Sequence, residues 1–269
     1  MVTLALPRLF ASGGSAGRAL SMVERNVSAL RGAYWIVVAT GLFEPVFYLL
    51  SIGVGVGALV GDIPLPGGRS VAYAVFVAPA LLASSAMTGA LSETTFNFFG
   101  KMKFMRLYDG ILATPLRPME IAFGELSWAM VRGSVYAAAF CVIMVAMDLT
   151  SAGRAVIAFL AAVLVGFAFG GVGLAMTTFM RSWQDFDLMS SAQFALFLFS
   201  GTFVPAESYP VVLRWLVEVT PLYRSVHLIR GISIGTWSWV QLLDVFYLLI
   251  LFVGGVTVAG RRMGRLLLK

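Results

Sequence analysis

The segment Glu93–Leu126 reads ETTFNFFGKMKFMRLYDGILATPLRPMEIAFGEL and is the longest polar interruption between two strongly apolar stretches of the sequence. It contains Lys101, Lys103, Arg106 and Arg117, interspersed with Phe and Met residues. A basic, partly aromatic segment between two apolar stretches predicts a water-exposed connection between two buried helices. We therefore expect this segment to be a surface on which another protein acts.

The composition identifies the chain as a membrane protein. Of its 269 residues, 59% are hydrophobic and only 12% are charged, with a mean hydropathy of +0.91. Soluble domains carry roughly 25% charged residues. Several apolar stretches approach the ~20 residues that a helix needs to cross a bilayer, whereas barrel strands would alternate over ~10 residues. The sequence thus predicts an all-α membrane protein.

The apolar stretches predict six transmembrane helices in one domain covering residues 1–269. The predicted spans are residues 33–59, 71–91, 121–147, 155–179, 188–204 and 239–259. Residues 16–32 place their apolar side chains on one helical face, which predicts an amphipathic helix lying at the membrane interface. Residues 93–118 form the polar connection between the second and third spans. Residues 205–236 combine prolines with charges, which predicts short re-entrant helices packed on protein.

The orientation follows from the positions of Lys and Arg. Five arginines fall on one side of the six spans: Arg69, Arg154, Arg214, Arg224 and Arg230. The other side has thirteen basic residues: Arg8, Arg18, Arg25, Arg31, Lys101, Lys103, Arg106, Arg117, Arg181, Arg261, Arg262, Arg265 and Lys269. The richer side is predicted to be cytoplasmic, so residues 93–118 and both termini lie inside and residues 205–236 lie outside.

Three ionisable residues within the spans are candidates for a functional or packing role, namely Glu44, Glu125 and Arg132. A charge in the bilayer is costly unless it is paired or hydrated, so these residues line a path or bond between helices, or, for Glu125 and Arg132, mark a shallow depth in the membrane. The fifth span carries Met189, Phe194 and Phe197, which suit a greasy substrate path and core packing equally well. The glycines Gly166, Gly170, Gly171 and Gly173 predict close helix contacts.

The sequence lacks the residues for an active site of its own. It has one histidine, His227, and one cysteine, Cys141, so HExxH zinc chemistry and cysteine metal clusters are excluded. Gly100-Lys101 is followed by Met102, and no GxxxxGK[ST] loop for nucleotide phosphates is present. We expect no bound cofactor and no metal, and any ATP must be used by a partner. The basic residues flank apolar spans, which favours contact with anionic lipid over nucleic acid.

Three segments together resemble the type-2 ATP-binding-cassette permease family, and are closest to its nodulation-factor and drug exporters. They are FEPVFYLLSIGVGVG at Phe43–Gly57, FMRLYDGILATPLRPMEIAFGEL at Phe104–Leu126, and SGTFVPAESYPVVLRWLVEVTPLYRSVHLIRG at Ser200–Gly231. The resemblance covers nearly the whole chain. The third segment is the most specific of the three, with its GTF-x-P opening, Pro210, Pro221-Leu222 and Arg230-Gly231.

The resemblance implies a permease subunit of an exporter in the bacterial inner membrane. Such a subunit pairs with a second, identical or paralogous permease and docks two copies of a separate ATPase that binds ATP and Mg. Its cargo would be an amphipathic drug, lipid or lipo-oligosaccharide. The alternatives are a permease for polysaccharide or lipid-linked glycan, and a non-transport membrane scaffold.

The resemblance also assigns residues. The family's ATPase-coupling helix would correspond to a segment containing Phe99, Lys101, Lys103, Phe104, Arg106, Leu107 and Tyr108. Its external re-entrant helices would contain Pro205, Glu207, Pro210, Pro221 and Arg230. An alternative for Lys101, Lys103 and Arg106 is anchoring to anionic lipid.

Overall fold

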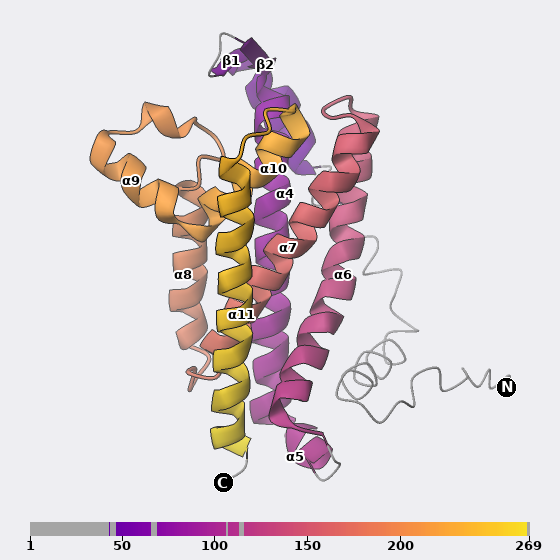
Figure 1. Ribbon diagram of the computed structural model, residues 1–269, viewed down its shortest axis with the longest axis vertical. Helices are drawn as coiled ribbons and strands as arrows, with labels where there is room; N and C mark the ends of the chain where they lie inside the picture. Colours follow the sequence, from indigo (N-terminus) through magenta and orange to yellow (C-terminus); the bar gives the residue numbers. More distant parts are fainter. Residues whose placement is uncertain (1–42, 44–46, 66–68, 106, 113–115, 268–269) are drawn as a thin grey trace, which may run out of the picture.

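The computed structural model describes residues 43, 47–65, 69–105, 107–112 and 116–267 (Figure 1). Within this part of the chain, four helices are long and apolar enough to cross a membrane. They are Tyr73–Phe104, Pro118–Ala146, Ala152–Thr177 and Val240–Leu266. Figure 1 shows them as one elongated bundle with the remaining elements at its two ends and along one side.

The elements follow in this order. The chain begins with the π-helical η1 (Leu49–Val56), the short helix α3 (Gly57–Val60), and strands β1 (Asp62–Leu65) and β2 (Arg69–Ala72). The next part comprises α4 (Tyr73–Ser92), the π-helical η2 (Glu93–Asn97) and η3 (Gly100–Phe104), α5 (Leu107–Leu112) and α6 (Pro118–Ala146). The last part comprises α7 (Ala152–Thr177), α8 (Asp185–Leu198), the 3₁₀ turn η4 (Ala206–Ser208), α9 (Val211–Val219), α10 (Pro221–Ile234) and α11 (Val240–Leu267).

The four long helices lie where the second, third, fourth and sixth spans are predicted. The predicted span 188–204 falls on α8, but that helix ends at Leu198. The residues between Leu198 and η4 are not helical. The whole interfacial helix 16–32 and about half of the first predicted span, residues 33–42 and 44–46, lie outside the described residues. The total of six spans therefore stays a prediction.

The connection between the first two predicted spans contains a small hairpin. Strands β1 and β2 pair antiparallel, with Asp62 opposite Ala72 and Leu65 opposite Arg69. Gly61 separates α3 from β1 at a φ of +71°, a conformation that side-chain-bearing residues rarely adopt. The described part of the chain is thus a helical bundle with one short hairpin outside it.

Local signals fix where two of the helices begin and end. Pro118 is the first residue of α6, and the Glu120 carboxylate accepts from the Arg117 backbone N–H at 2.9 Å, which is half of a capping box. The Thr220 hydroxyl accepts from the Tyr223 N–H at the start of α10. Gly235 ends α10 in the left-handed conformation, with its N–H donating to the Gly231 carbonyl.

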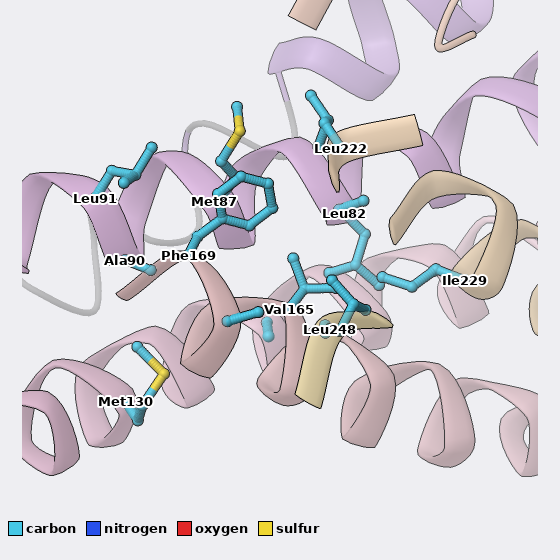
Figure 2. Close-up of a cluster of buried hydrophobic side chains, with 14 of the residues drawn as sticks. Leu82, Met87, Ala90, Leu91, Met130, Val165, Phe169, Leu222, Ile229 and Leu248 are labelled. Atoms are coloured by element: carbon cyan, nitrogen blue, oxygen red, sulfur yellow. The ribbon is translucent and has the colours of Figure 1, made fainter. Parts of the chain in front are cut away.

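Helix α7 is the centre of the bundle, because it contacts α4, α6, α10 and α11. Its glycines allow these contacts: a Cβ at Gly166 would lie 2.9 Å from the Met130 sulfur, and one at Gly171 would lie 3.0 Å from the Phe252 carbonyl oxygen. The predicted close packing at the α7 glycines is therefore confirmed. Figure 2 shows the core that results, with labelled side chains from α4, α6, α7, α10 and α11.

The bundle has two different ends, which Figure 1 shows at top and bottom. We call the end with β1, β2 and the α6–α7 turn the hairpin end, and the end with α5 and the last turns of α11 the α5 end. The five arginines predicted to be external belong to elements toward the hairpin end, whereas Lys101, Lys103 and the arginines of the last turns of α11 lie at the α5 end. The described basic residues are thus separated between the two ends as the predicted topology requires.

Candidate functional site

The polar segment that interrupts the apolar sequence continues the second long helix. Helix α4 runs through η2 and η3 without a break in helical structure as far as Phe104, so Tyr73–Phe104 is one helix of 32 residues. The first and last parts of this helix lie at opposite ends of the bundle (Figure 1). The two π-helical segments both fall in its α5-end half, and such wider turns are often found at functional positions.

Two ion pairs join this helical extension to α6. Lys101 Nζ lies 2.6 Å from Glu125 Oε2, and Arg132 Nη1 lies 2.6 Å from Glu93 Oε1. The Glu125 side chain is only 5% exposed, so its charge requires this kind of compensation. For Glu125 and Arg132, the structure thus supports the interhelical alternative. Glu44, the third predicted ionisable residue, lies outside the described residues.

An aromatic cluster joins the same extension to the connection between α7 and α8. The Phe99 ring meets the rings of Trp183 and Phe186 edge-on, with 5.3 and 5.1 Å between ring centres. The Phe104 ring stacks on the Trp183 ring, with 5.4 Å between their centres. Phe96 stacks on Phe186 at 4.4 Å. Phe104 and Trp183 remain 63% and 48% exposed, so the cluster has a buried base and an open outer face.

The turn that carries Trp183 is held by a carboxylate. The backbone N–H groups of Arg181 and Ser182 donate to Asp185 Oδ2 at 2.7 and 3.1 Å. These donors stabilise the charged form and hold the pKa of the Asp185 carboxyl below its usual value. Trp183 was not predicted to be a site residue, although it lies in a short polar connection next to an aromatic-rich segment.

The residues predicted to couple to an ATPase have different environments. Lys103 and Phe104 are exposed, Leu107 is half-buried, and Phe99 and Tyr108 are buried. Lys101 is occupied by its contact with Glu125. Arg106 lies outside the described residues. Among the described residues of the predicted coupling surface, the accessible ones are therefore Lys103 and Phe104, and the neighbouring Met105 is 73% exposed.

A groove of about 380 Å³ lies mainly between α4 and α8. Two of the three residues predicted to line a substrate path, Phe194 and Phe197 of α8, line this groove. Much of its remaining wall carries hydroxyl and amide groups, from Ser84, Ser85, Thr88, Ser92, Ser190 and Gln193. Gln193 Nε2 donates to Thr88 Oγ1 at 2.9 Å and so links the two helices. Met189, the third predicted residue, is buried and does not line the groove.

The polar wall was missed by the sequence analysis because it depends on register. Ser84, Ser85, Thr88 and Ser92 are spaced by one, three and four residues, which places them on one side of an α-helix. That spacing was visible in the sequence. The partner helix that turns this stripe into a groove was not.

The predicted external segment contributes to a second cavity, of about 290 Å³, near the hairpin end. Pro205, Glu207 and Arg230 line it, whereas Pro210 precedes α9 and Pro221 begins α10. Arg230 donates from Nε to the Phe76 carbonyl at 3.0 Å and from Nη2 to the Gly201 carbonyl at 2.9 Å. Its guanidinium carbon also lies 3.7 Å from the centre of the Phe76 ring. Arg230 therefore fastens α10 to α4 and to the chain after α8.

An ionisable residue of the last span was overlooked. Asp244 is fully buried in α11, with one oxygen 3.2 Å from Arg224 Nη1 and the other 2.6 Å from His227 Nδ1. Its position five residues into the predicted span 239–259 was a sufficient signal, because a carboxylate at that depth requires partners. His227 thus has a packing role between α10 and α11.

Comparison with known proteins places the chain in a transport family. The family model described as "ABC-2 type transporter" matches residues 19–234. The chain belongs to the ABC-2 type transporter family. This ABC-2 chain is 32% identical over 217 residues to nodulation protein J of Rhizobium leguminosarum bv. trifolii, covering 80% of this chain and 81% of the relative.

Two further relatives cover similar shares. Nodulation protein J of Rhizobium meliloti is 27% identical over 218 residues, which is 81% of each chain. The inner membrane transport permease YadH of Escherichia coli is 24% identical over 212 residues, covering 77% of this chain and 78% of the relative. The family resemblance inferred from the three sequence segments is therefore confirmed, and the ABC-2 chain is a transporter permease.

Within the described residues, no three His, Cys, Asp or Glu side chains are grouped so that they could hold a metal ion. Three features of the described residues that could contact other molecules are the exposed surface at the α5 end, the groove between α4 and α8, and the cavity near the hairpin end. Helix α4 contributes residues to all three.

Proposed function

We propose that this ABC-2 chain is the permease subunit of an exporter driven by a separate ATPase. It pairs with a second permease, identical or paralogous, and two ATPase copies bind ATP and Mg and dock at the α5 end. That end faces the cytoplasm of a bacterial cell, with both termini on the same side of the inner membrane. The hairpin end faces outward, and an amphipathic molecule moves toward it.

The observation that carries this proposal is the continuity of α4. Its α5-end extension presents Lys103 and Phe104, its middle supplies the hydroxyl side of the groove, and its first turn holds Phe76 against Arg230. A push on the extension would reach the groove through a helix that has no loop in between. The ion pairs with α6 would carry the same displacement sideways.

The groove supports an amphipathic cargo. Phe194 and Phe197 of α8 offer apolar surface, and polar groups come from both helices: the serines and Thr88 of α4, and Ser190 and Gln193 of α8. A molecule with an apolar body and a hydroxyl- or amide-bearing head satisfies both kinds of surface. This description fits drugs, lipids and lipo-oligosaccharides as classes.

The docking surface can be tested with the double variant Lys103→Glu/Phe104→Ala, co-expressed with the candidate ATPase. We expect the variant to lose copurification of the ATPase and the cargo-stimulated part of its ATP hydrolysis. Arg265→Glu is the matched control, because it reverses an exposed charge in the last turn of α11. Lys101 is left unchanged, since its replacement would disturb the contact with buried Glu125.

The groove needs a separate variant. Ser85→Phe fills it from α4, and we expect basal ATP hydrolysis with the partner to persist while cargo stimulation is lost. The control variant Val142→Phe adds the same ring on α6, where Val142 is 67% exposed. We expect this control to behave as wild type. Normal ATPase binding and stimulation in Lys103→Glu/Phe104→Ala would refute the docking surface. Normal stimulation in Ser85→Phe would refute the groove as the path.

A further inference from the structure

A second surface groove, of about 280 Å³, lies between the end of α9 and the first turns of α11. Its wall consists of Val219, Arg224, Leu243, Phe246, Tyr247 and Ile250. Tyr247 closes one side, because its hydroxyl donates to the Val219 carbonyl at 3.0 Å. The groove is therefore apolar apart from the Tyr247 hydroxyl and one cation, Arg224.

The apolar wall of this groove belongs to the membrane-facing surface of α11. Leu243, Phe246 and Ile250 are 64%, 63% and 55% exposed although α11 is one of the long apolar helices. They recur every three to four residues, so they lie on one face of the helix. In a transport protein of the membrane, such a face is covered by lipid chains.

Two tryptophans indicate the depth of the groove. Trp237 and Trp239 directly precede α11 and are 55% and 82% exposed. Exposed tryptophans at the end of a spanning helix mark the level of the lipid headgroups. Asp244, which holds Arg224, lies four residues after Val240, or roughly 6 Å further along the helix. Arg224 is thus held near the phosphate and ester level of the leaflet at the hairpin end.

Below Arg224 the groove continues toward the middle of the bilayer. From Leu243 to Ile250 the helix advances roughly 10 Å. The arrangement is a cation at the headgroup level with an apolar channel leading inward from it. This arrangement matches the two parts of one phospholipid molecule in that leaflet.

The contacts of Arg224 leave its side chain available for an anion. Its Nη1 donates to Asp244 Oδ1 at 3.2 Å, whereas a guanidinium has five N–H donors. The other Asp244 oxygen contacts His227, so the carboxylate is shared between two partners. The Arg224 side chain is 29% exposed and lines the groove. Asp244 therefore positions the guanidinium without enclosing it.

We propose that this groove binds one phospholipid from the hairpin-end leaflet. The phosphodiester accepts hydrogen bonds from Arg224, and an acyl chain lies along Leu243, Phe246 and Ile250. The site is distinct from the groove between α4 and α8, and it does not depend on the proposed transport function or on the ATPase.

The test uses the full chain, purified in mild detergent, with native mass spectrometry to count bound phospholipid. Arg224→Gln removes the cation, and Ile250→Trp obstructs the acyl channel without touching the Asp244 contacts. The matched controls are Arg214→Gln, an external arginine of α9 that does not line the groove, and Val142→Trp on α6. The added lipids are phosphatidylglycerol, phosphatidylcholine and a diglucosyl diacylglycerol, which has the same tails and no phosphate.

We expect wild type and both controls to bind either phospholipid in preference to the glucolipid. Affinity should fall about fivefold in Arg224→Gln, as expected for one basic side chain at a lipid surface. Ile250→Trp should lose both phospholipids to a similar extent. If Arg224→Gln does not fold, the comparison of Ile250→Trp with Val142→Trp decides the question.

Several results would overturn the proposal. Equal phospholipid binding by all the variants would show that the groove is not a site. An equal loss in Arg214→Gln would indicate diffuse attraction to charge, and equal competition by soluble glycerophosphate would indicate a phosphate site without a lipid. A change in oligomeric state in Ile250→Trp with unchanged lipid binding would make this face an interface between copies.

Discussion

The crossing of α7 and α11 predicts a large difference between two adjacent glycines. A methyl group at Gly255 would lie 2.6 Å from both the carbonyl oxygen of Gly171 and the backbone N of Val172, whereas ordinary contacts begin at 3.4 Å. The Gly171 carbonyl carbon would lie closer still, so the obstacle is backbone: no side chain can rotate away, and the two helices would have to move apart. Overpacking of this kind typically costs about 1–3 kcal/mol.

Gly254 is the matched control, because a Cβ there would meet nothing within 4 Å. Within a helix, alanine is more favourable than glycine by roughly 1 kcal/mol. We therefore expect Gly254→Ala to be neutral or slightly stabilising and Gly255→Ala to unfold at a clearly lower temperature.

The protein offers its own probe for this measurement. Cys141 is the sole cysteine of the sequence and is buried, so a thiol-reactive fluorogenic dye reports unfolding in detergent as the side chain becomes accessible. At roughly 2–4 °C per kcal/mol for a chain of this size, Gly255→Ala should lower the Tm by several degrees. Equal Tm values for Gly255→Ala and Gly254→Ala would refute the close crossing of α7 and α11.

Two further predictions concern the ion pair between Arg132 and Glu93 and the orientation of the bundle in the membrane. Arg132→Gln should lower the free energy of unfolding by about 1–3 kcal/mol because it leaves the Glu93 carboxylate without its cation. The double variant with Glu93→Gln should recover part of this loss in the same thermal assay, and no recovery would exclude a direct coupling. In a Cys141→Ala background, a cysteine at Leu65 should react with an impermeant thiol reagent added outside intact cells, and one at Lys103 should not. The reverse labelling pattern would invert the proposed orientation.

Much of the architecture could be predicted because lipid imposes a simple rule. A stretch of about twenty apolar residues has to be a helix, so α4, α6, α7 and α11 were located from composition and length alone. The contacts of α7 were also predictable, since its glycines have little other use within an apolar helix. The stop of α8 at Leu198 was not predicted, because residues 199–204 carry no charge and include Phe199, Phe203 and Val204, so they were assigned to the same span.

The candidate sites depended more on which helices are neighbours. The basic segment was found from its charges, yet Lys101 is paired with Glu125, a residue 24 positions away on another helix. Phe99 is buried against Trp183 and Phe186, and Tyr108 against Phe98, and these contacts between segments are not contained in a single sequence pattern. Asp244 is different, since its charge inside an apolar stretch was visible and simply overlooked.

Arg230 also has a consequence for how the protein is made. It bonds to the carbonyls of Phe76 and Gly201, so it connects segments that leave the ribosome long before it does. Synthesis proceeds from the N-terminus, and α4 therefore enters the membrane well before its partner at position 230 exists. The closure of the hairpin end is then one of the last steps of biogenesis. A chain truncated before α10 would leave that end open, and quality-control proteases could recognise it there.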